Sequence, residues 1–189
     1  RRVVGSIRCH ALFLDPAIKN DHRMNLCADE ILEADHAELD RLLTDVIQAL
    51  ADGDLNQSYT KLDLFWARLA MHIRAEHLHL FPALLQQNKA DPEIVDLIRL
   101  LRIDHDFFMT EIARLIKNLR AASNSTATEV MQAAREALEK IAERLEDHNK
   151  LEESRLYPLA SDLGGAESEL LALKVRKELD NFPPRFKVV

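Results

Sequence analysis

The sequence predicts an all-α protein, an up-down antiparallel four-helix bundle with a short extension at each end. Two observations predict this class. Four long segments repeat apolar residues at spacings of three and four, the period of one helix face. Glycine is scarce, with 4 in 189 residues, which is too few for a fold of many tight turns and short strands. We expect an N-terminal extension (1–27), the bundle (28–163) and a C-terminal extension (164–189).

The first two predicted helices are separated by a clear stop signal. The first helix covers residues 28–51 and ends before Gly53, a residue that suits the end of a helix. The second covers residues 56–87 and carries Phe81-Pro82 near its end. Proline cannot donate a backbone hydrogen bond, so this pair predicts a kink or a stop there.

The third and fourth predicted helices begin at recognisable caps. The third starts at Asp91-Pro92, an N-cap followed by proline at the first helical position, and runs to about residue 122. The fourth starts at the capping-box pattern of Thr126 and Glu129 and reaches Tyr157-Pro158. Residues 166–179 allow a short fifth helix in the C-terminal extension. Connections as short as these make neighbouring helices antiparallel.

Polar residues interrupt each apolar stripe at positions that should face the core. A single histidine interrupts the first and the third helix, and His-x-x-x-Glu interrupts the second and the fourth. The six residues are His36, His72, Glu76, His105, His148 and Glu152. Burial of a charge without compensation costs several kcal/mol, so a buried set of this size must be paired or bind a cation. These residues therefore predict a metal centre.

An internal repeat supports this prediction. Residues 72–82 align with residues 148–158, and an Asp-His pair precedes each segment, at 35–36 and at 104–105. Residues four apart lie on one helix face, so each His-x-x-x-Glu can reach a common site. Divided evenly, the set supplies two histidines and one carboxylate to each of two ions, an arrangement that suits non-haem iron. Zinc and manganese could also bind to such ligands.

In the order and helix placement of these six residues, the chain resembles the hemerythrin-like HHE cation-binding family over about residues 28–160. The resemblance implies a four-helix bundle that holds two iron ions and binds or reacts with oxygen, nitric oxide or peroxide. It also implies that the six residues are the ligands. Met109 stands where oxygen-carrying hemerythrins have a further histidine, which argues against reversible oxygen carriage. Between the adjacent Glu152 and Glu153, Glu152 is preferred because it matches Glu76 in the repeat.

Three further side chains on these helices have open roles. His79 lies about 10 Å beyond His72 along the helix axis, so it is either an extra ligand or a neighbour of the site. His77 is turned off the inner face, and we expect it at the surface. Tyr157 aligns with Phe81 in the repeat. It either donates a hydrogen bond to the centre or only packs under the proline kink.

Three aspartates, Asp35, Asp104 and Asp147, each precede a predicted ligand histidine. Consecutive side chains on a helix point about 100° apart, so none of them can orient the histidine that follows it. Each aspartate either orients a histidine on a neighbouring helix or belongs to a solvated acidic rim.

Two functions fit these features. The first is a binding or sensing protein that takes up oxygen, nitric oxide or peroxide. The alternative is a di-iron enzyme of oxidative or nitrosative stress defence, which decomposes peroxide or repairs iron–sulfur clusters. The cluster-repair group typically carries a cysteine-pair domain, and Cys9 and Cys27 do not match it. A helical interaction module whose polar core residues only fix the register is a third interpretation, and it predicts no metal.

Composition excludes several partners. The net charge is −7 and no run of Lys and Arg could follow a phosphate backbone, so we expect no nucleic acid partner. No apolar stretch approaches the ~20 residues of a membrane span. Two cysteines cannot form a disulfide scaffold, and we therefore expect a cytoplasmic protein.

Overall fold

The computed structural model describes residues 26–88 and 91–186, and within them it contains helices and connections but no strand. The prediction of an all-α protein is confirmed. The predicted N-terminal extension lies almost wholly outside the described residues. The elements are α1 (Ala28–Ala51), α2 (Leu55–Ala75), η1 (Glu76–Leu80), α3 (Phe81–Gln87), α4 (Pro92–Ala121), α5 (Ala127–Leu151), η2 (Glu152–Leu156), α6 (Tyr157–Ser161), α7 (Gly165–Leu179) and η3 (Pro184–Phe186).

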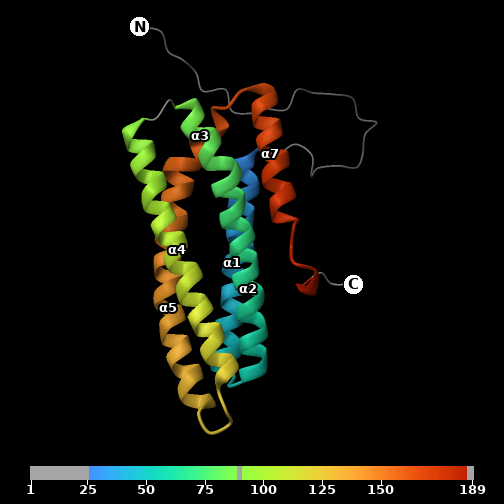
Figure 1. Cartoon of the computed structure of the whole chain (residues 1–189), viewed down its shortest axis with the longest axis vertical. Helices are drawn as coiled ribbons and strands as arrows, with labels where there is room; N and C mark the ends of the chain where they lie inside the picture. Colours follow the sequence, from blue (N-terminus) through green and yellow to red (C-terminus); the bar gives the residue numbers. More distant parts are fainter. Residues whose placement is uncertain (1–25, 89–90, 187–189) are drawn as a thin grey trace.

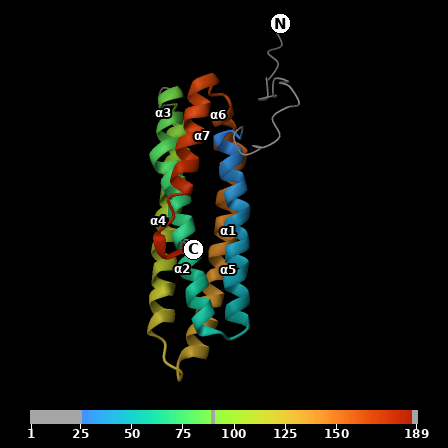
Figure 2. The same cartoon turned by 90° about the vertical axis from the view of Figure 1, so that its right-hand side faces the viewer.

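The long helices α1, α2, α4 and α5 lie side by side, and each runs antiparallel to its neighbour in the chain (Figure 1). The fifth helix, α7, packs against α1 and α2 at the end that also carries α3 and α6 (Figure 2). α7 is the short fifth helix that residues 166–179 allow, and it adds to the four helices that the apolar stripes predict. None of the described helices is long and apolar enough to cross a membrane.

Side-chain caps fix two of the helix starts. Asp54 accepts a hydrogen bond from the backbone N–H of Gln57 at 2.9 Å at the start of α2. Asp91 accepts one from Glu93 at 2.9 Å at the start of α4, as its sequence predicts. The capping box predicted at Thr126 does not form. The Thr126 hydroxyl instead accepts from the backbone N–H of Ser123 at 3.0 Å, because the preceding turn folds back onto it.

The helix does not end at Phe81-Pro82. It widens into a π-helical turn over η1, in which the backbone N–H of Phe81 donates to the carbonyl of Glu76, five residues earlier. The repeat-related turn η2 does the same, with Tyr157 donating to Glu152. π-helical turns inside α-helices are rare and are frequent at functional sites. Both begin at the glutamate of a His-x-x-x-Glu segment.

The buried apolar residues form two separate clusters. The lower cluster lies toward the two turns that end α1 and α4, and it includes Leu43, Phe65, Ile112 and Leu138. The upper cluster lies toward α3, α6 and α7. The predicted ligand histidines lie between the two clusters along every long helix, so a polar layer divides the apolar interior.

Candidate metal centre

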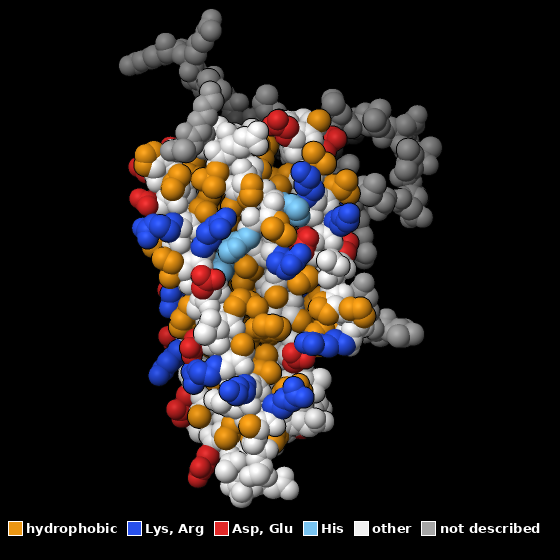
Figure 3. Space-filling model, viewed as in Figure 1, with side chains coloured by type: hydrophobic (Ala, Val, Ile, Leu, Met, Phe, Trp, Pro, Cys, Tyr) orange, Lys and Arg blue, Asp and Glu red, His pale blue; other side chains and the backbone are white. Residues whose placement is uncertain are grey.

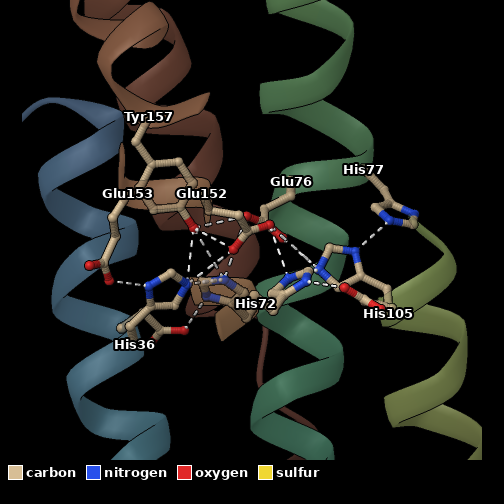
Figure 4. A network of polar contacts seen from close by, with 11 residues as sticks. His36, His72, Glu76, His77, His105, Glu152, Glu153 and Tyr157 are labelled. Atoms are coloured by element: carbon tan, nitrogen blue, oxygen red, sulfur yellow. Dashed lines mark hydrogen bonds and ion pairs between the residues drawn. The ribbon is translucent and has the colours of Figure 1, made fainter. Parts of the chain in front are cut away.

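All six predicted ligand residues converge in the polar layer, and Figure 4 labels every one of them except His148. Each of the four long helices supplies one histidine, and each π-helical turn supplies one glutamate as its first residue. All six side chains are buried, with residue exposures between 0% and 3%. A buried set of imidazoles and carboxylates is stable only if its members compensate one another or bind a cation.

The histidines form two pairs. In site A, the Nε2 atoms of His36 and His72 lie 3.2 Å apart. In site B, the Nε2 atoms of His105 and His148 lie 2.9 Å apart. Glu152 belongs to both groups that could hold a metal ion, one with the site A pair and one with the site B pair.

Both glutamates reach from one pair to the other. Glu152 places Oε2 3.4 Å from Nε2 of His36 and Oε1 3.2 Å from Nε2 of His148. Glu76 places Oε1 3.6 Å from Nε2 of His72 and Oε2 3.3 Å from Nε2 of His105. Each carboxylate thus offers one oxygen to each site. If a cation were bound at each site, these two carboxylates could each offer it one oxygen.

Two buried carboxylate oxygens indicate that cations would fit between these residues. Oε2 of Glu76 and Oε1 of Glu152 are buried and have no hydrogen-bond partner. An unpartnered buried oxygen carries an uncompensated desolvation cost, and a cation beside it removes that cost. Imidazole nitrogens with carboxylate oxygens suit iron, zinc or manganese.

Each histidine also has a partner on its outer nitrogen, Nδ1. The carboxylate of Asp35 lies 3.0 Å from Nδ1 of His72. The equivalent distance from Asp104 to His148 is 3.3 Å. A histidine that donates from Nδ1 to a carboxylate keeps the lone pair of Nε2 free for a metal. Asp35 and Asp104 therefore each orient a histidine on a neighbouring helix, which is one of the two roles that the sequence left open. The third aspartate, Asp147, is exposed.

The outer nitrogens of the other two histidines have partners at equivalent positions of the repeat. Oε1 of Glu153 lies 2.7 Å from Nδ1 of His36. Nε2 of His77 lies 2.9 Å from Nδ1 of His105. The expectation that His77 is a surface residue was wrong, since it is half-buried. That expectation considered only the inner face of its own helix, and it did not include the contact that His77 makes with His105 on α4.

His79 lies outside the centre. Its Nε2 is 3.8 Å from Oε2 of Glu178 on α7, and the residue is in neither group that could hold a metal ion. Glu153 contacts the outer nitrogen of His36 rather than the inner one. Neither residue is therefore placed as an additional ligand.

Tyr157 is the main feature that the sequence left unresolved. Its side chain is fully buried, and its hydroxyl points into site A (Figure 4). The oxygen lies 2.9 Å from Oε1 of Glu76 and 3.1 Å from Nε2 of His36. In a regular α-helix, residues five apart point about 140° apart, so Tyr157 would turn away from Glu152. The wide turn of η2 brings them to the same face, with Oη 3.4 Å from Oε2 of Glu152.

The polar surroundings change the acidity of these groups in different directions. Burial lowers the pKa of His72, but the carboxylates of Glu76 and Asp35 outweigh burial and raise it to about 10. Burial dominates at His105 and lowers its pKa well below the usual value. Burial and the charges of Glu152 and Glu76 raise the pKa of Tyr157 well above its usual value. Without a cation, Tyr157 is therefore a hydrogen-bond donor to the two carboxylates.

Comparison with known proteins agrees with this geometry. The model of the family described as hemerythrin HHE cation binding domain matches residues 27–160, a range that contains all six converging residues. Neither the search of curated proteins nor the search of solved structures returned a match.

Proposed function

The chain belongs to the hemerythrin HHE cation-binding family, and from this premise we propose that it is a non-haem di-iron protein that binds or senses oxygen, nitric oxide or peroxide. The ligands are His36 and His72 in site A, His105 and His148 in site B, and Glu76 and Glu152 between them. The helices α1, α2, α4 and α5 act as an up-down four-helix bundle around the centre, in a cytoplasmic protein.

One observation carries this proposal. Two buried glutamates each direct one oxygen to each histidine pair, and one oxygen of each glutamate has no hydrogen-bond partner. Those two oxygens lie 3.3 Å from Nε2 of His105 and 3.2 Å from Nε2 of His148, so each stands beside a nitrogen that could bind the same ion. Two cations could bind the Nε2 atoms of all four histidines and the oxygens of both glutamates. Mixed nitrogen and oxygen ligation of this kind suits iron.

An anaerobic titration tests the proposal. Ferrous iron is added stepwise to metal-free protein, bound iron is counted, and the absorption spectrum is recorded before and after oxygen or nitric oxide is admitted. We expect saturation at two irons per chain and charge-transfer bands that change with the gas. Reversal on degassing would indicate a carrier rather than a sensor or an enzyme. Saturation at one iron, or no iron binding, would contradict the proposal.

The contact between His77 and His105 favours a second candidate, a di-iron enzyme of stress defence that decomposes peroxide. Histidine side chains reach the surface on the face drawn in Figure 3. His77 is half-buried, and its Nε2 lies 2.9 Å from Nδ1 of His105 in site B. This gives protons a route to the site, which peroxide turnover needs. The measurement is the rate of peroxide loss with iron-loaded protein. A rate no higher than that of a His72→Ala/His148→Ala double variant would exclude this candidate.

A further inference from the structure

The hydroxyl of Tyr157 lies among the four inner donor atoms of site A. The oxygen is 2.9 Å from Oε1 of Glu76 and 3.1 Å from Nε2 of His36. It is 3.4 Å from Oε2 of Glu152 and 3.5 Å from Nε2 of His72. The donors are similarly spaced among themselves, with 3.2 Å between the two imidazole nitrogens and 3.6 Å between His72 and Glu76. All these distances lie between 2.9 Å and 3.6 Å.

The distances from the Tyr157 oxygen to the four donor atoms show whether it occupies a ligand position or the position of the ion. Adjacent ligands of an octahedral ion lie about 3 Å apart, because each lies about 2.1 Å from the ion and the two bonds meet near a right angle. An oxygen at the position of the ion would lie about 2 Å from every donor. The Tyr157 oxygen therefore stands at a ligand position and leaves the ion position free.

Site B has no such oxygen. Phe81 takes the position of Tyr157 in the first half of the repeat. Its ring is stacked on His105, with centroids 6.1 Å apart and planes 7° apart. The ring of Tyr157 is stacked on His36 in the same manner, at 5.5 Å and 24°. The two aromatic rings are thus equivalent in placement, and only the ring at site A carries a hydroxyl.

The unpartnered carboxylate oxygens follow from this difference. Oε1 of Glu76 and Oε2 of Glu152 face site A and accept hydrogen bonds from Tyr157. Oε2 of Glu76 and Oε1 of Glu152 face site B and have no hydrogen-bond partner. A phenyl ring at Phe81 cannot supply the missing donor or ligand. Site B therefore keeps four inner donor atoms, and the ligand position equivalent to that of the Tyr157 oxygen is open.

We propose that the two ions are unlike, with Tyr157 as a ligand of the ion in site A and an open position in site B where the exogenous small ligand binds. This inference rests on the proposed function, because it requires two bound ions. When the phenol oxygen binds a ferric ion, the O–H bond breaks and its proton leaves to solvent. Site A then has one ligand position fewer available than site B, and Phe81 forms an apolar wall beside the additional open position of site B.

The first test looks for the bond to Tyr157. Iron content is measured first, and the oxidised iron-loaded protein is then examined by visible absorption and resonance Raman spectroscopy. We expect a phenolate-to-iron charge-transfer band with tyrosine ring modes, and its loss in Tyr157→Phe. The chain has two tyrosines, so Tyr59→Phe is a matched control that should keep the band. Tyr59 lies 13 residues before His72 on α2, or about 20 Å along its axis.

The second test counts open positions with azide. We expect the wild-type protein to bind one azide per chain and Tyr157→Phe to bind a second. Phe81→Tyr should acquire a second phenolate signal and bind no azide at concentrations that saturate the wild type. Circular dichroism and iron content show whether this variant is folded, and the wild-type azide stoichiometry tests the proposal without any variant.

Each outcome separates this inference from the proposed function. If the wild-type protein binds fewer than two irons per chain, the proposed function fails and this inference fails with it. If two irons bind but tyrosine modes are absent, only the ligand role of Tyr157 is overturned. If two irons bind and the wild type takes up no azide or two azides, or if a folded Phe81→Tyr binds azide normally, the open position in site B is overturned.

Discussion

The outer partners of site A and site B differ, although they occupy equivalent positions of the repeat. In site A, the outer nitrogens of the histidines contact two carboxylates, Asp35 and Glu153. In site B, they contact one carboxylate, Asp104, and the imidazole of His77. The two halves of the repeat therefore supply the same histidines and glutamate. They differ in charge at one outer position, which is Glu153 in site A and His77 in site B.

The two sites also differ in how deeply their aspartates are buried. The side chain of Asp35 is 1% exposed and is paired with Arg68, whose other nitrogen donates to the carbonyl of Leu179 at the end of α7 at 3.1 Å. The side chain of Asp104 is 23% exposed and is paired with Arg144, with an Nε–Oδ1 distance of 2.9 Å. Electrostatic interactions are stronger away from water, so the carboxylates should hold a cation in site A more tightly. We expect site A to fill before site B when iron is limiting.

The largest effect should come from removal of one inner histidine from each site. His72→Ala and His148→Ala should each lower the iron content from two ions to one, because each pair loses a donor that nothing else replaces. Only His148→Ala should also abolish azide binding, since the open position lies in site B. Iron analysis and azide titration of the two variants check this. Loss of azide binding in His72→Ala alone would reverse the assignment of the two sites.

A smaller effect is expected from the aspartates. Asp35→Asn should weaken iron binding in site A by up to about 100-fold, because outer partners of ligating histidines typically contribute 10–100-fold to metal affinity. Asp104→Asn should weaken site B less, because Asp104 is more exposed. Competition with a chelator of known affinity measures both constants. Equal losses in the two variants would show that burial does not distinguish the sites.

Glu153 and His77 occupy equivalent positions of the repeat, so substitutions there compare the two sites directly. The expected effects on iron affinity are smaller than those of the aspartates. Glu153→Gln keeps an acceptor for Nδ1 of His36 but removes a charge that is 40% exposed, so we expect about a 10-fold loss of affinity in site A. His77→Gln removes no carboxylate and should change site B less. Glu153→His would give site A the outer partners of site B. If the order of filling then stays as in the wild type, charge is not the cause of the difference.

Substitutions of apolar residues far from the polar layer should leave the iron content of both sites unchanged. Leu138→Ala in the lower cluster and Leu84→Ala in the upper cluster each remove a fully buried side chain. Each should lower the free energy of unfolding by about 2–5 kcal/mol, because a cavity remains. Chemical denaturation measures this change, and the iron content of the folded protein should stay at two. A lost ion in either variant would mean that packing far from the polar layer positions the ligands.

The sequence was sufficient to predict the helical class and the convergence of the six polar residues, because both depend on spacings of three and four along regular helices. It was insufficient for Tyr157, since that spacing turns the side chain away from Glu152 and only the wide turn of η2 restores it. Contacts across helices were also hidden, as His77 shows: its partner His105 lies on another helix. The place of α7 depends on tertiary contacts with α1 and α2, which no local pattern specifies.

The polar layer also has a consequence for how the chain unfolds. Within the part of the chain that the structure describes, it separates the buried apolar residues into two clusters. Ions bound by residues from all four long helices would tie the clusters into one cooperative unit, because opening either end would then break metal bonds. Without them, amide hydrogens should exchange first at the end built from the short helices α3 and α6. The number of bound ions would thereby set the number of steps in which this protein unfolds.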